Sequence, residues 1–73
     1  MKQTLLEIKR KTNITTQALA ERAQLPISDV FTVEAGGYTS LEKARRVITA
    51  FNQLSGMRVA VEDIKIRNQG GRL

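Results

Sequence analysis

The side chains that carry chemistry in this chain are charged groups and hydroxyls, because its 73 residues include neither histidine nor cysteine. The seven acidic residues are scattered along the sequence, without an accompanying nucleophile or base. Neither a general acid–base pair nor a metal-ligand cluster can be assembled from such residues. We therefore expect no enzymatic activity, no catalytic residue, no metal and no cofactor.

Positive charge is the most pronounced chemical property of the sequence. Twelve lysines and arginines against seven acids give a formal net charge of +5 and a pI near 10.3. This balance suits an anionic partner, and nucleic acid is the first candidate. The basic run 9–11 and the side chains of Lys43, Arg45 and Arg46 have two interpretations, as phosphate contacts or as ordinary solvated surface.

The length and apolar content indicate one small globular domain. Hydrophobic residues make up 41% of the chain, which is typical of a folded domain. Without cysteine there are no disulfides, so stability has to come from apolar packing, with or without a second subunit. No apolar run approaches the roughly 18 residues of a membrane-spanning helix, and no signal-peptide pattern opens the chain, so we expect a cytoplasmic protein.

Apolar spacing and cap residues predict five short helices. The first lies in the opening segment, where Leu5 and Ile8 are three residues apart with charged residues between and around them. Thr15 is the expected N-cap of the second helix, over about 16–23. The inward residues of that helix are expected to be Leu19, Ala20 and Ala23.

The third helix is expected to begin with Pro26, whose preset φ suits a first helical turn, and to run to about Glu34. Val30 and Val33 form its inward pair, and Gly36 closes it in the left-handed conformation.

A capping box formed by Thr39 and Glu42 predicts a fourth helix that reaches about Asn52. Its inward residues at helical spacing are Leu41, Ala44, Val47, Ile48 and Phe51. Residues 61–66 are expected to form the fifth short helix or a turn, and residues 57–61 alternate as a brief strand would. The expected domain spans 1–66, and 67–73 is expected to be a flexible basic tail.

The segment "ITTQALAERAQLPISDVFTVEAGG" followed by "SLEKARRVITAFNQL" resembles the Cro and phage-repressor helix-turn-helix family, also called the xenobiotic-response-element class. The resemblance runs from about Leu5 to Ile64. The matching residues are Leu19, Ala20, Leu25, Val30, Val33, Glu34 and Gly36. It implies an all-α, compact five-helix lambda-repressor-like domain with the helix-turn-helix at about 16–34. It also implies a bacterial or phage-encoded, cytoplasmic regulator of transcription, a repressor in the usual case, that binds specific double-stranded DNA sequences.

Two positions depart from the family pattern. The family usually has glycine in the turn where this chain has Gln24, and often has glutamine at the start of the leading helix, where this chain has Thr16. Gln24 must therefore adopt a left-handed conformation at some energetic cost, or the turn is built differently.

The resemblance also implies which residues contact DNA. Ile27, Ser28 and Thr32 are expected to approach base edges, and Phe31, four residues after Ile27, completes an apolar pair that suits thymine methyl groups. The phosphate contacts are expected from four residues: Thr15, Thr16, Gly37 and Tyr38. Lys9 and Glu34 are expected to form a structural pair, in which lysine replaces the family's usual arginine.

Two further questions remain open at this level. Ile27 and Phe31 are as consistent with ordinary core residues or a protein-contact patch as with base contacts. A protein-contact patch would make the chain a protein-interaction module such as an antitoxin or anti-repressor partner. A homodimer is expected to use apolar residues of the last third: Met57, Val59, Val61 and Ile64. No small-molecule ligand is indicated.

Overall fold

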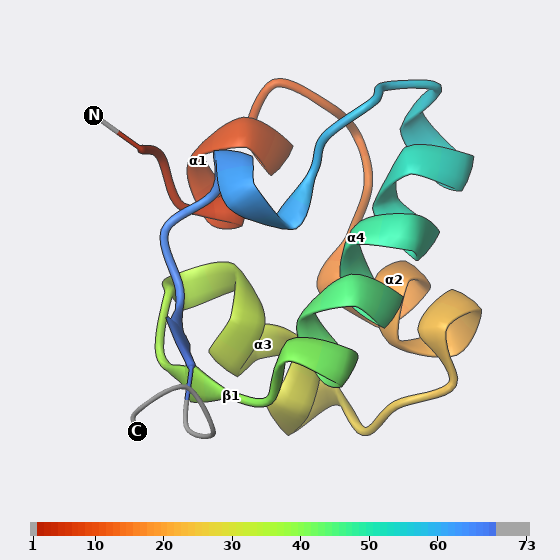
Figure 1. Ribbon diagram of the computed structural model, residues 1–73. Helices are drawn as coiled ribbons and strands as arrows, with labels where there is room; N and C mark the ends of the chain where they lie inside the picture. Colours follow the sequence, from red (N-terminus) through yellow and green to blue (C-terminus); the bar gives the residue numbers. More distant parts are fainter. Residues whose placement is uncertain (1, 69–73) are drawn as a thin grey trace.

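The computed structural model describes residues 2–68, and four α-helices form most of this part of the chain (Figure 1). The helices are α1 (Leu5–Lys9), α2 (Thr16–Ala23), α3 (Ile27–Ala35) and α4 (Leu41–Ser55). A 3-10 turn, η1 (Val61–Asp63), and two short strands, β1 (Tyr38–Thr39) and β2 (Arg67–Asn68), complete the fold. The strands pair in parallel, with Tyr38 opposite Arg67. The expectation of a mainly helical chain is confirmed.

Of the two alternatives for residues 61–66, a fifth helix or a turn, the helix is wrong. Only residues 61–63 form a single 3-10 turn, and Ile64 is extended, with φ −116° and ψ 158°. Ile64 pairs with Gln3 in an isolated parallel bridge, and Lys65 N–H donates to Gln3 O at 2.8 Å. Because these backbone groups find partners near the N-terminus of the chain, the segment is extended rather than helical.

The brief strand expected over 57–61 is also wrong. Residues 56–60 have no regular structure and are held by one side chain of α4. The Asn52 amide donates to Val59 O and its carbonyl accepts from Val59 N–H, both at 2.9 Å. The backbone N–H and carbonyl of Val59 therefore bond to the Asn52 side chain rather than to a neighbouring strand.

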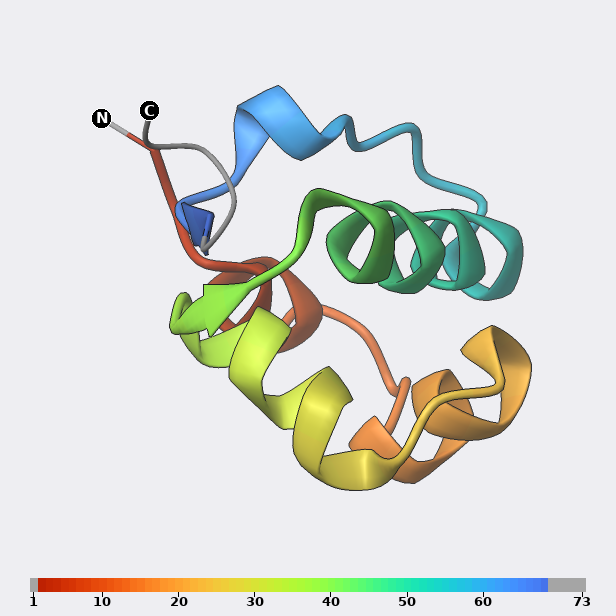
Figure 2. The same cartoon turned by 60° about the horizontal axis from the view of Figure 1, so that its bottom comes forward.

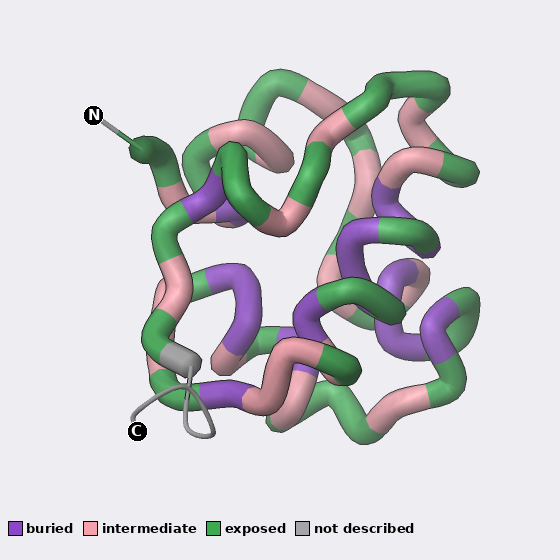
Figure 3. The backbone as a smooth tube through the Cα atoms, in the orientation of Figure 1, coloured by how far each residue is buried: buried purple, intermediate pink, exposed green. Residues whose placement is uncertain are grey.

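The core is built from every helix and from the segment after η1 (Figure 3). α4 packs against both α2 and α3 (Figure 2). The expected inward residues of α2, α3 and α4 are buried, except that Leu41 is only half-buried. Ile64 is also a core residue, with 2% of its surface exposed, while Val59 and Val61 are half-buried against the core. Of the four residues expected at a dimer contact, only Met57 is exposed, because the others complete the core of the single chain.

Local capping signals account for most helix ends. Thr15 caps α2 by accepting a hydrogen bond from Ala18 N–H at 3.0 Å, as expected. Gly36 closes α3 with φ 81°, also as expected. The capping box at Thr39 is wrong: Ser40 is the N-cap of α4 and accepts from Lys43 N–H. Thr39 is committed to β1 and is 5% exposed, so it cannot serve as the cap.

The connection between α2 and α3 contains Gln24, Leu25 and Pro26. Gln24 takes the left-handed conformation, with φ 59° and ψ 47°, and its N–H donates to Ala20 O. Pro26 precedes the first residue of α3 and stands at its N-cap position with φ −59°. Of the two alternatives for Gln24, the structure contains the strained one.

The start of the expected C-terminal tail is part of the fold, because residues 67–68 form β2. The remainder of that tail, 69–73, lies outside the described residues. Over residues 2–68, no helix has the length and apolar character needed to cross a membrane.

Candidate nucleic-acid interface

Helix α3 has two chemically different faces. Val30, Val33 and Glu34 point inward and are fully buried. On the outer side, Ile27 and Phe31 are 51% and 55% exposed, and Ser28 is exposed beside them. The structure therefore brings three of the four expected base-contacting residues to one open surface. The interpretation of Ile27 and Phe31 as core residues is wrong.

Thr32, the fourth expected base contact, is half-buried at the edge of this surface. Its hydroxyl donates to Ser28 O at 2.9 Å, so the hydroxyl hydrogen is used within the helix and the oxygen can still accept. The Thr32 methyl group lies close to Gly37, because a Cβ placed at position 37 would be only 3.1 Å from it. The outer face of α3 thus offers apolar surface and single hydroxyl groups.

An acidic side chain borders the same face. The Asp29 carboxylate lies 3.3 Å from Lys43 Nζ of α4, and both side chains are partly exposed. An ion pair of this kind contributes little to stability, but it offsets a negative charge next to the outer face of α3.

The two threonines at the start of α2 are in different situations. Thr15 is exposed, and its hydroxyl accepts from the backbone while its own hydrogen remains free to donate. Thr16 is half-buried, and its hydroxyl donates to Glu34 Oε1 and accepts from Lys9 Nζ, both at 2.9 Å. The Thr16 hydroxyl thus links Lys9 of α1 to Glu34 of α3, and the expected phosphate contact of Thr16, through its hydroxyl and backbone N–H, stays a prediction.

Lys9 and Glu34 form the expected structural pair between α1 and α3. Nζ lies 3.3 Å from Glu34 Oε2, and the two side chains are 11% and 0% exposed. Oε2 accepts no hydrogen bond from residues 2–68, so its contact with Nζ is one of charge alone. The hydrogen bonds instead run from Lys9 through Thr16 to the other carboxylate oxygen.

The flank beyond α3 is formed by Gly37 and Tyr38. Gly37 N–H donates to Thr32 O at 2.9 Å, and Gly37 O accepts from Arg67 N–H at 3.2 Å. Both polar backbone groups of Gly37 are used in these bonds, and the expected phosphate contact of Gly37 stays a prediction. Tyr38 is 61% exposed, and its ring lies against Arg67, whose guanidinium carbon is 5.4 Å from the ring centroid.

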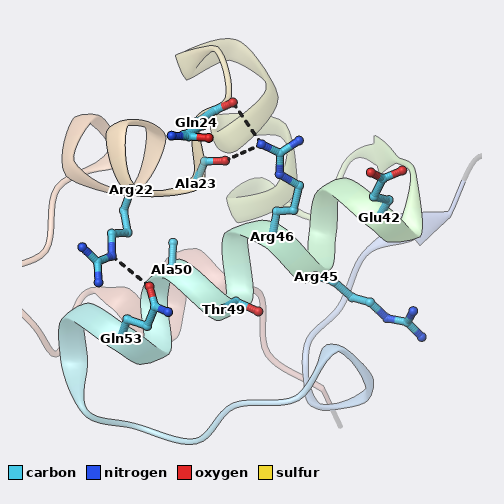
Figure 4. Close-up of a pocket in the computed structure, with 9 residues that line it drawn as sticks. All are labelled: Arg22, Ala23, Gln24, Glu42, Arg45, Arg46, Thr49, Ala50 and Gln53. Atoms are coloured by element: carbon cyan, nitrogen blue, oxygen red, sulfur yellow. Dashed lines mark hydrogen bonds between the residues drawn. The ribbon is translucent and has the colours of Figure 1, made fainter.

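A cleft of about 490 Å³ lies between α4 and the C-terminal end of α2 (Figure 4). Arg46 points from α4 toward the last carbonyls of α2, and Arg22 Nε donates to Gln53 Oε1 at 2.8 Å. Arg45 points away from both. The three arginines of the cleft therefore diverge, and two of them are engaged within the chain. Residues 2–68 contain no cluster of three or more potential metal ligands.

Two cations make contacts in the structure that the sequence does not indicate. Arg67, on the segment expected to be a basic tail that either follows DNA or has no role, lies beside Tyr38. Arg46, for which a phosphate contact and solvated surface were the two interpretations, donates to the last carbonyls of α2. Neither position carries a local signal, because each contact joins residues far apart in the sequence.

Comparisons with protein-family models, curated proteins and solved structures find no match to this chain.

Proposed function

We propose that this protein is a sequence-specific regulator of transcription that binds double-stranded DNA by placing α3 in the major groove. In this proposal α2 and α3 are a helix-turn-helix of the Cro and phage-repressor type. The observation that carries the proposal is the exposure of Ile27, Ser28 and Phe31 on a helix whose opposite face is held in the core. The major groove of B-DNA admits one α-helix, and only a helix with a free face can enter it.

The surroundings of α3 support the same function. The net charge of +5 suits a polyanion. Thr15 offers a hydroxyl at the N-terminus of α2, and Tyr38 offers one on the other flank of α3. Phosphate contacts on both sides of a recognition helix set its register on the duplex, whereas base contacts specify the sequence.

The composition of the face defines the kind of DNA site. None of its residues is an arginine, lysine, asparagine or glutamine, the residue types that form bidentate contacts with bases. Ile27 and Phe31 suit thymine methyl groups, and Ser28 and Thr32 provide single hydrogen bonds. The proposed site contains T-rich positions and, as one domain contacts only part of a helical turn, is bound by two copies on a two-fold sequence.

Selection from a random duplex pool tests the proposal. We expect enrichment of one sequence with thymines at the positions facing α3, and weaker binding when uracil, which lacks the methyl group, replaces them. A pool that yields no preferred sequence would contradict the proposal, and indifference to uracil would contradict the role of the apolar pair.

A protein-interaction module is the second candidate, and the exposed apolar pair Ile27 and Phe31 favours it. Its partner would be a protein with a complementary apolar groove. Salt separates the two candidates, since affinity based on phosphate contacts falls steeply with salt concentration and apolar contacts respond little.

A further inference from the structure

Strand β2 brings a C-terminal cation to the end of the proposed recognition helix. Gly37 links the two through its backbone, because its N–H donates to Thr32 O and its carbonyl accepts from Arg67 N–H. Arg67 is therefore two backbone hydrogen bonds away from Thr32, which is on α3. β1 packs against α3 and β2 lies next to β1 (Figure 2).

The side chain of Arg67 is exposed and oriented by an aromatic ring. Its guanidinium carbon lies 5.4 Å from the centroid of the Tyr38 ring. A cation–π contact with the ring favours this position of the guanidinium while its N–H groups stay free to donate. No carboxylate of residues 2–68 pairs with Arg67: the ion pairs in this part of the chain are Lys9–Glu34 and Lys43–Asp29.

Helix α3 carries no basic side chain, because its only charged residues are Asp29 and Glu34. Lys43, the nearest cation on α4, is already paired with Asp29. Arg67 of β2 adds a positive charge on this flank that has no carboxylate partner within residues 2–68. Lys65, two residues earlier, is also exposed, with the half-buried Ile66 between them, as alternation along an extended segment requires.

We infer that Arg67 binds a phosphate of duplex DNA on the flank of α3, with Tyr38 orienting its guanidinium, so that β2 is part of the nucleic-acid surface. This inference rests on the proposed function and adds a contact from a segment outside the two helices. A contact of this kind strengthens binding to every sequence and carries no base preference.

The test measures the affinity of the full chain for a fluorescent random-sequence duplex and for the selected duplex over a range of salt concentrations. The variants are Arg67→Gln and Arg67→Lys. Arg58→Gln is the matched control, because Arg58 is exposed in segment 56–60, at the opposite end of the molecule from β1 (Figure 1). The pairing of β2 uses the backbone of Arg67, so these variants keep the fold, which circular dichroism verifies.

We expect Arg67→Gln to weaken binding roughly three- to tenfold on both duplexes and to reduce the slope of log K against log salt by about 1. Arg67→Lys retains most of the slope because it keeps the charge, and Arg58→Gln matches the wild type. A wild-type slope in Arg67→Gln overturns the inference and leaves the proposed function intact. If the wild type shows no preference for any sequence but Arg67→Gln still lowers the slope, the phosphate contact stands and sequence-specific regulation fails.

Discussion

Arg46 Nη2 donates a hydrogen bond of 3.3 Å to the carbonyl of Gln24, the only non-glycine residue of 2–68 with a positive φ. The same nitrogen donates to Ala23 O at 2.9 Å. The last carbonyls of a helix have no N–H partner within it, and a cation is favourable beside them. α4 thus stabilises the turn that sets the direction of α3.

Gln24→Gly is expected to stabilise the protein. Glycine adopts the left-handed conformation without the steric cost that glutamine bears, and the gain after its larger unfolded-state entropy is about 0.5–1 kcal/mol. Urea or thermal unfolding measures the change. Gln17→Gly, on the exposed side of α2 in the right-handed conformation, is the control and should be destabilising. A loss of stability in Gln24→Gly would mean that its left-handed conformation carries no strain.

Arg46→Ala is expected to destabilise the protein by about 1–2 kcal/mol, because two carbonyls lose a charged donor. The neighbouring Arg45 points away from these carbonyls, so Arg45→Ala should change the free energy of unfolding by less than about 0.5 kcal/mol (Figure 4). Equal effects of the two substitutions in chemical denaturation would exclude a capping role for Arg46.

Lys9→Met is expected to cost about 3–5 kcal/mol, since it leaves the fully buried Glu34 carboxylate without a counter-charge. Lys11→Met removes the same charge from an exposed position and should be close to neutral. Replacing both partners, Lys9→Met with Glu34→Leu, should recover much of the loss. Near-wild-type unfolding of Lys9→Met alone would show that the pair contributes little.

Ile64→Ala is expected to lower the free energy of unfolding by about 2–5 kcal/mol, as truncation of a buried side chain leaves a cavity. Met57→Ala, at an exposed position, should have little effect on stability. Sedimentation of folded Ile64→Ala should give the same mass as the wild type. If the wild type is a dimer and only this substitution dissociates it, Ile64 is a dimer contact rather than a core residue of the single chain.

Phe31→Ala is expected to weaken DNA binding by roughly tenfold through loss of an apolar base contact, with stability changed by less than about 0.5 kcal/mol. Val30→Ala, one residue earlier on the buried face, should instead cost about 2 kcal/mol of stability. Unfolding curves and fluorescence titrations on the selected duplex separate the two effects. Similar destabilisation by both substitutions would mean that the outer face is packed in solution.

Local sequence signals were sufficient for the two central helices. Thr15 marks the start of α2, and the turn around Pro26 separates α2 from α3. Gly36 marks the end of α3. The spacing of Val30 and Val33 identified the inward side of α3, and both residues are fully buried. Caps and helical periodicity operate within about four residues, so these features can be inferred from short segments.

Elements that depend on distant partners were not predictable in this way. Both Thr39 and Ser40 are suitable caps for α4, and the pairing of β1 with β2 removes Thr39 from the choice. Residues 61–66 have helix-compatible composition, yet pairing with Gln3 extends Ile64 and buries its side chain.

The features of the candidate site also fall into two groups, those that local sequence predicts and those that only packing decides. The inward pair Val30 and Val33 and the suitability of Thr15 as a cap follow from local sequence, whereas the exposure of Ile27 and Phe31 is decided by the packing of α3. How the helices and strands pack decides three further contacts. They are the hydrogen bond from the half-buried Thr16 to Glu34, the bonds from Arg46 to residues 22 and 23 positions away, and the cation–π contact of Arg67 with Tyr38. Contacts between residues so far apart leave no periodic or capping pattern, so they are specified only when the whole chain folds.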